Sequence, residues 1–362
     1  MSRPGTRMYE LDLLRFLAAA SVVAFHFTYG NHALGLNPVA YPAPLMAVTK
    51  YGFLGVQIFF FISGIVILNS AQSGSGRRFA ISRIVRLYPA YWACVTLTFL
   101  VINMAGTRHI PVSDYVVNMT MLEGFVLHPL VDAVYWTLQV ELVFYGIIWL
   151  TLVAGQMKRI TLVLWAWLGV AAALSAAQLA GVVVPNRFVV AIGYAPYFVT
   201  GAAAALITRG NRSRPVVAML VAAGGLSLVR AIFDARNAND HYHAINTSVA
   251  VAIVAVSMVV VLAVAFGRLS RIGRPWMVSL GLLTYPLYLI HDEVSNVLFN
   301  HWKSVNRWLL LPLVLAVVLA IATAVHLAVE EPVAPRLRAV LTRGFGRDRP
   351  AGVPIAAASR PE

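Results

Sequence analysis

The sequence predicts an all-α protein, a polytopic membrane helix bundle with about ten transmembrane helices and both termini in the cytoplasm. Of its 362 residues, 60% are hydrophobic and only 12% are charged, and the mean hydropathy is +0.77. The charged fraction is roughly half that of an average soluble domain. Apolar runs of about twenty residues, long enough to cross a bilayer, recur along the whole chain. We expect spans at 11–30, 51–70, 84–105, 135–155, 160–181, 188–207, 215–234, 245–267, 276–299 and 308–329.

The distribution of the 28 basic residues supports this count. With a cytoplasmic amino terminus, 20 of them fall in the cytoplasmic loops and tail and one, Arg15, lies within the first span. This is the positive-inside asymmetry, and it requires an even number of spans. The net charge of +14 is therefore explained by basic residues beside the lipid bilayer. Nucleic acid is not an expected partner. The remaining seven are Lys50, Arg108, Arg187, Arg230, Arg236, Lys303 and Arg307, on the opposite side.

We expect one integral-membrane domain, residues 1–334, followed by a basic and partly disordered cytoplasmic tail, 335–362. Two outer segments, 106–134 and 235–244, are rich in polar residues and are either solvated loops or surfaces that meet an acceptor molecule. Cys94 is the only cysteine, which excludes an intrachain disulfide and a cysteine metal cluster. His241 and His243 are weak evidence for a metal, and none is expected.

The first span carries the strongest candidates for chemistry, because ionisable groups are costly within a membrane. Arg15 and His26 are eleven residues apart, about three helical turns, so their side chains project from the same face. Asp12, one turn before Arg15, can pair with it. A neutral His26 imidazole can take a proton from a hydroxyl, although a structural histidine bonded to a neighbouring helix is the alternative.

Two later spans carry further polar groups. Arg83 and Arg86, at the cytoplasmic start of the third span, can hold the phosphates of a cofactor or serve as an ordinary membrane anchor. In the fourth span Glu141 and Thr137 share a face, so a carboxylate beside a hydroxyl is expected to point into the bundle and to orient His26 or pair with an arginine.

The second and ninth spans also carry polar residues, and for these a purely structural role is the alternative to a functional one. Ser63 and Gly64 interrupt an aromatic run in the second span, which favours close helix packing. In the ninth span Pro286 is expected to kink the helix, while Asp292 or Glu293 holds His291 near the outer interface.

In order along the chain, these residues resemble the membrane-bound acyltransferase-3 family. The matching stretches are Asp12-Leu-Leu-Arg15 with His26, Phe59-Phe60-Phe61-Ile-Ser63-Gly64, Arg83-Ile-Val-Arg86 with Tyr88-Pro89, Trp136-Thr-Leu-Gln-Val-Glu141 with Phe144-Tyr145, and Tyr285-Pro-Leu-Tyr288-Leu-Ile-His291. One departure is Glu330-Glu331-Pro332, where the family has a basic residue between the glutamate and the proline.

The resemblance implies an O-acyltransferase that moves an acyl group, most often acetyl, from cytoplasmic acyl-CoA to a hydroxyl of an envelope polysaccharide, glycolipid or related acceptor. On this reading it is a stand-alone form without an extracytoplasmic esterase-like domain, in the bacterial inner or plasma membrane. His26 acts as the base, with Glu141 or Asp12 to orient it, Arg15 organises it or binds the donor, and Arg83 and Arg86 engage CoA. The supporting residues are Asp12, Ser63, Tyr88, Trp136, Tyr288 and His291.

Other functions stay open on the residues alone. A transporter of a glycan precursor or small anion would also use intramembrane Arg15, Glu141 and His26. A purely structural membrane protein is disfavoured, because it has little reason to bury such groups. An acyl-enzyme on Ser63 is an alternative to direct attack by the acceptor. The sequence leaves open the acceptor, the length of the acyl group and whether the protein forms a homodimer.

Overall fold

The structure, a computed structural model, describes residues 8–71, 75–185 and 188–344. Within these ranges it consists of helices and contains no strand, which confirms the all-α prediction. The α-helices are α1 (Tyr9–Phe25), α2 (Asn31–Ala33), α3 (Ala43–Thr49), α4 (Gly55–Ala71), α5 (Gly76–Ala105), α6 (Val112–Asn118), α7 (Trp136–Val153), α8 (Ile160–Leu179), α10 (Ala195–Thr208), α11 (Arg214–Tyr242), α12 (Thr247–Ala265), α13 (Met277–His301), α14 (Arg307–Val325) and α15 (Glu331–Gly344). The short 3-10 or π turns are η1 (His26–Gly30), η2 (Gly52–Leu54), η3 (Ala133–Tyr135), η4 (Met157–Arg159), η5 (Val189–Gly193), η6 (Ser270–Ile272) and η7 (His326–Glu330).

Among the described residues, eight helical stretches are long and apolar enough to cross a membrane, against the ten spans expected. The two expected spans that are not among these eight stretches are 188–207 and 276–299. The first contains α10, which is apolar but has only 14 residues. The second contains α13, whose 25 residues include Asp292 and Glu293. At 1.5 Å per residue α13 is still about 37 Å long, enough to cross a bilayer.

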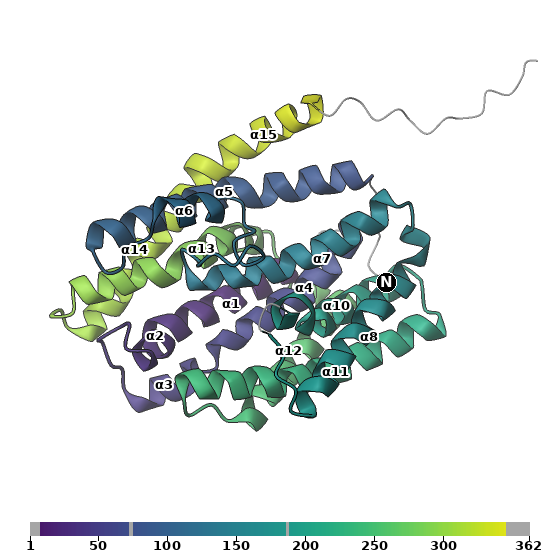
Figure 1. Ribbon diagram of the computed structural model, residues 1–362, viewed down its shortest axis with the longest axis horizontal. Helices are drawn as coiled ribbons and strands as arrows, with labels where there is room; N and C mark the ends of the chain where they lie inside the picture. Colours follow the sequence, from purple (N-terminus) through teal and green to yellow (C-terminus); the bar gives the residue numbers. More distant parts are fainter. Residues whose placement is uncertain (1–7, 72–74, 186–187, 345–362) are drawn as a thin grey trace, which may run out of the picture.

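The helices run between two ends of the bundle (Figure 1). At the end where α2 and α3 lie, here called the outer end, the Tyr29 hydroxyl donates to the carbonyl of Tyr242 at the end of α11 (2.9 Å). At the opposite or inner end, Arg77 at the start of α5 donates to the carbonyl of Thr342 in α15 (2.8 Å). The start of α1 and the end of α15 thus belong to the same end of the bundle. That this end is cytoplasmic remains a prediction from the charge asymmetry.

The last helix is longer than the expected span. α14, η7 and α15 follow one another directly, and they form one helical run, Arg307–Arg343. Figure 1 shows α15 extending beside α5 at the edge of the bundle. The first residues of the predicted tail, up to Gly344, are therefore helical, and 345–362 lie outside the described residues.

Both polar outer segments are more ordered than solvated loops would be. In 106–134, which contains α6 and the start of η3, Glu123 and Asp132 have no exposed surface. Burial raises the pKa of the Glu123 carboxyl, because the charged form loses hydration. The expected loop 235–244 is mostly wrong, since α11 continues to Tyr242. Arg230, expected on the outer side, is buried within this helix at 4% exposure.

The second span packs closely against α10, as Ser63-Gly64 predicted. A methyl group on Gly64 would overlap the carbonyl oxygen of Phe198 in α10, and one on Gly201 would overlap the carbonyl of Phe61 in α4. The two backbones therefore meet without intervening side chains, which holds the α4 residues of the site in place.

We expect Gly201→Ala to destabilise the bundle by about 1–3 kcal/mol, because the new methyl group must displace backbone rather than a flexible side chain. The matched control is Gly146→Ala in α7, where an added methyl group meets nothing within 4 Å. Thermal unfolding in detergent measures the difference. Equal melting temperatures for the two variants would contradict the close α4 and α10 contact.

Candidate active site

His26 begins a π-helical turn at the outer end of α1. In a π-helix residues five apart lie above one another, unlike in an α-helix. The turn accordingly brings Asn31 back onto His26, and the Asn31 Oδ1 atom lies 3.2 Å from the His26 Nδ1 atom. π turns are common at functional sites, and this one brings the Asn31 side chain to the His26 imidazole.

Asp292 of α13 is the carboxylate that pairs with His26. Its Oδ1 atom lies 3.1 Å from His26 Nδ1 and accepts a 2.7 Å hydrogen bond from the Asn31 side-chain amide. A carboxylate can only accept, so Nδ1 carries a proton, and in the neutral imidazole Nε2 then has the free lone pair. The expectation that Glu141 or Asp12 orients His26 is therefore wrong, since Asp292 occupies that position.

His291 lies against His26, with ring centroids 5.1 Å apart, and has no exposed surface. Its Nδ1 atom lies 2.8 Å from the Tyr288 carbonyl, and its Nε2 atom has no hydrogen-bond partner among the described residues. The expectation that Asp292 or Glu293 holds His291 is wrong. Glu293 pairs with Arg108 instead (3.1 Å), because successive residues of a helix face different directions.

The segment before α7 holds this part of α13 in place. Within α13, Glu293 follows Leu289 by four residues, about one helical turn along the chain. The Glu293 N–H donates to Asp132 Oδ2 (3.3 Å), and the Leu289 carbonyl accepts from the Tyr135 hydroxyl (3.1 Å). The other Asp132 oxygen caps η3 through the Val134 N–H (3.1 Å). These contacts fix the turn that carries His291 and Asp292.

His26 lines a cavity of about 490 Å³, here called the outer cavity. Its volume lies within the range typical of small-molecule sites. The aromatic residue Trp136, an expected supporting residue, is part of its wall, beside Tyr194 at a ring-centroid distance of 5.2 Å. The other wall residues that enter the argument below are Val56, Gln57, Asp234 and Tyr288.

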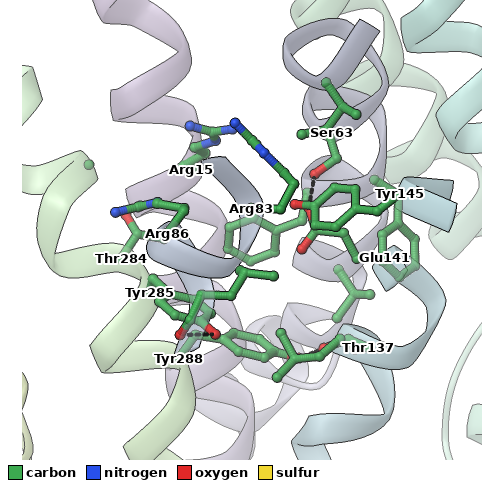
Figure 2. A pocket seen from close by; sticks show the side chains of 17 residues that line it. Arg15, Ser63, Arg83, Arg86, Thr137, Glu141, Tyr145, Thr284, Tyr285 and Tyr288 are labelled. Carbon is green, nitrogen blue, oxygen red and sulfur yellow. Dashed lines mark hydrogen bonds between the residues drawn. The ribbon is translucent and has the colours of Figure 1, made fainter. Parts of the chain in front are cut away.

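A second, smaller cavity of about 120 Å³, here called the inner cavity, is lined by Arg15, Arg83, Arg86 and Glu141. Figure 2 shows the Arg15 and Arg83 side chains reaching toward one another above the cavity, with Arg86 to one side. Arg15 and His26 both point into the bundle, as expected, but they line separate cavities.

The three guanidinium groups of the inner cavity differ in their partners. Arg86 forms a 2.6 Å ion pair with Glu330, and Arg15 lies 4.0 Å from Asp12, as expected. Arg83 forms no ion pair within the described part of the chain and donates to the Ser82 hydroxyl (2.9 Å). Arg83 and Arg15 are thus the cations with most capacity to bind a further anion. In Glu330-Glu331-Pro332, where the sequence differs from the family pattern, Glu330 is retained and neutralises Arg86.

Glu141 points into the inner cavity with a hydroxyl beside it, but this hydroxyl belongs to Ser63 and not to Thr137. The Ser63 Oγ atom donates to Glu141 Oε1 (2.6 Å), as the dashed line in Figure 2 shows. Thr137 instead contacts the Tyr288 hydroxyl (3.0 Å). The pairing of Glu141 with Thr137 was predicted only from their position on one face of the same helix. Such a pattern carries no information about side chains that come from neighbouring helices.

Two residues, Val56 and Tyr288, line both cavities. They separate the arginine cluster on one side from His26 on the other. Tyr88, another expected supporting residue, lies outside both cavities, and its hydroxyl donates to the Thr120 carbonyl (2.8 Å). Tyr288 therefore has a more central position than the sequence indicated, and Tyr88 a more peripheral one.

A family model for the acyltransferase domain known as Acyl_transf_3 matches residues 8–327 of the chain. Searches of curated proteins and of solved structures give no match. The matched range contains both cavities, the His26 and Asp292 pair and the arginine cluster. The protein therefore belongs to acyltransferase family 3 and is a multi-pass membrane acyltransferase.

Proposed function

We propose that this acyltransferase moves an acetyl group from cytoplasmic acyl-CoA to a hydroxyl of an envelope polysaccharide, glycolipid or related acceptor, in the bacterial inner or plasma membrane. The observation that carries the proposal is the His26 and Asp292 pair on a cavity adjoining an arginine-lined one. A base poised beside a ligand-sized cavity suits the activation of a hydroxyl, and an arginine cluster suits a phosphorylated donor.

In the proposed reaction the acceptor hydroxyl lies in the outer cavity and gives its proton to His26 Nε2. Its oxygen attacks the thioester carbonyl and forms the new ester bond through a tetrahedral intermediate. The carbon–sulfur bond then breaks, and the CoA thiolate takes the proton back from His26. Asp292 stabilises the imidazolium that exists between the two proton transfers. No net proton or electron enters or leaves.

The donor would approach from the inner end. Arg83 and Arg15 would bind CoA phosphates, while Arg86, paired with Glu330, contributes charge at longer range. The acyl-pantetheine arm is uncharged and narrow, and it would pass Val56 and Tyr288 to reach His26. Ser63 lies on the inner cavity with Glu141, away from His26, which favours direct attack over an acyl-enzyme on Ser63.

We expect Arg83→Gln to raise the KM for acetyl-CoA about 10- to 100-fold, as the loss of a charge-assisted hydrogen bond to phosphate predicts. The measurement is binding and turnover of radiolabelled acetyl-CoA by purified protein in detergent. Arg212→Gln is the matched control, because Arg212 is exposed near the start of α11. A folded wild-type protein that neither binds nor turns over acetyl-CoA would refute the proposed donor.

A further inference from the structure

Gln57 of α4 is a buried polar residue in the wall of the outer cavity, and one of its hydrogen-bonding atoms is unused. The residue is 3% exposed and is part of the cavity wall together with His26. Its side-chain Nε2 atom donates to Asp234 Oδ2 (3.2 Å), whereas its Oε1 atom has no partner among the described residues. Leaving a buried acceptor unsatisfied is unfavourable, so this atom calls for an explanation.

The orientation of the Gln57 amide follows from the chemistry of its neighbour. A carboxylate only accepts hydrogen bonds, so the amide nitrogen must face Asp234 and the oxygen must face away from it. The free Oε1 atom can therefore bind only a donor, such as a hydroxyl or an amide N–H. An anionic group that lacks a proton would be repelled by it.

The charge of Asp234 is already compensated within the protein. Arg230 donates to Asp234 Oδ1 through Nε (2.8 Å) and lies 2.6 Å from the same oxygen through Nη2. The Tyr197 hydroxyl donates to Oδ2 (3.0 Å). Asp234 is the only carboxylate among the described residues of the outer-cavity wall, and no lysine or arginine is among them. The cavity wall thus contains an unmatched hydrogen-bond acceptor, and no lysine or arginine in it would attract an anionic ligand.

We propose that Gln57 Oε1 binds a hydroxyl of the acceptor in the outer cavity, and that the part of the acceptor held there is a neutral, hydroxylated group. Gln57 would then be a specificity-determining residue that orients the acceptor while His26 removes the proton of the reacting hydroxyl. The inference rests on the proposed function for the reaction itself, and adds which residue recognises the acceptor and what charge the acceptor carries there.

The test uses the full chain in a detergent without a sugar headgroup, with radiolabelled acetyl-CoA as donor. The acceptor probes are methyl β-D-glucopyranoside, its monodeoxy analogues and methyl β-D-glucuronate. We expect transfer to the glucoside to exceed transfer to the glucuronate, and one monodeoxy analogue to lose about tenfold in kcat/KM. Gln57→Met removes the amide oxygen at similar size and should lower kcat/KM for the glucoside by a similar factor.

The decisive readout is how the loss from the Gln57→Met substitution combines with the loss from removing one hydroxyl of the glucoside. If Gln57 binds the deleted hydroxyl, the Gln57→Met variant should no longer distinguish the glucoside from that analogue, so the losses are not additive. Gln156→Met, at an exposed position, should keep the wild-type discrimination. A uniform loss on all probes, preference for the glucuronate, or hydrolysis of acetyl-CoA without transfer to any probe would overturn the inference. Absence of any acetyl-CoA turnover by wild type would instead refute the proposed function.

Discussion

Replacing His26 by glutamine is expected to lower acyl transfer by about 10²- to 10⁴-fold, the usual contribution of a positioned general base. Glutamine keeps a polar side chain beside Asn31 and Asp292 but has no atom that takes up a proton near neutral pH. The reacting hydroxyl would then have to lose its proton to water. The measurement is kcat for transfer of radiolabelled acetyl from acetyl-CoA, with donor binding measured in parallel on the same preparations.

The control for this change is His109→Gln, since His109 is an exposed histidine of the outer segment. We expect that variant to keep wild-type turnover. Donor binding should survive in His26→Gln, because the arginines line the other cavity. Transfer at the wild-type rate by a folded His26→Gln protein would remove the base from the mechanism and leave His26 with a structural role.

Asp292→Asn is expected to cost about 10²-fold or more in kcat, since the equivalent change in the serine protease triad costs about 10⁴-fold. The new amide can donate a hydrogen bond to His26 Nδ1 and so favour the tautomer with the proton on Nε2. In that tautomer the atom that should accept the acceptor's proton already carries one. The same kinetic assay, run with the Asp240→Asn variant at an exposed site, checks the result.

Combining the two substitutions separates a shared role from two independent ones. If Asp292 acts through His26, the double variant should be no slower than His26→Gln alone, because groups that work as a unit lose their effect together. Multiplied losses in the double variant would show that Asp292 contributes to catalysis by another route, such as direct contact with the acceptor.

Much of the fold follows from local sequence properties. The positions of most long helices were predicted from the runs of apolar residues. The placement of the basic residues predicted that successive loops alternate between the two ends of the bundle. The sequence also singled out Arg15, His26, Arg83, Arg86 and Glu141 as candidate site residues. Each is an ionisable group in or beside a span, where such groups are rare. Their order along the chain carried the resemblance to a family that the comparison then confirmed.

The partners of these residues could not be predicted in the same way. Helical periodicity places Glu141 beside Thr137, yet its hydroxyl partner comes from α4. It also gives no reason to expect a π turn at His26, which brings Asn31 into contact with the imidazole. The gap at Gln57 Oε1 is likewise visible only once Asp234, on a different helix, takes up the amide nitrogen.

By itself the sequence determined the membrane-spanning helical class and the helices that carry ionisable groups, because hydropathy and periodicity are properties of neighbouring residues. Only the tertiary structure decided that Asp292 pairs with His26 and that the arginines and the histidine line two cavities that share the wall residues Val56 and Tyr288. The physical reason is that α4 and α13 each pack against α1, so that segments separate in the chain come together. No local pattern specifies which side chains then come within hydrogen-bond distance.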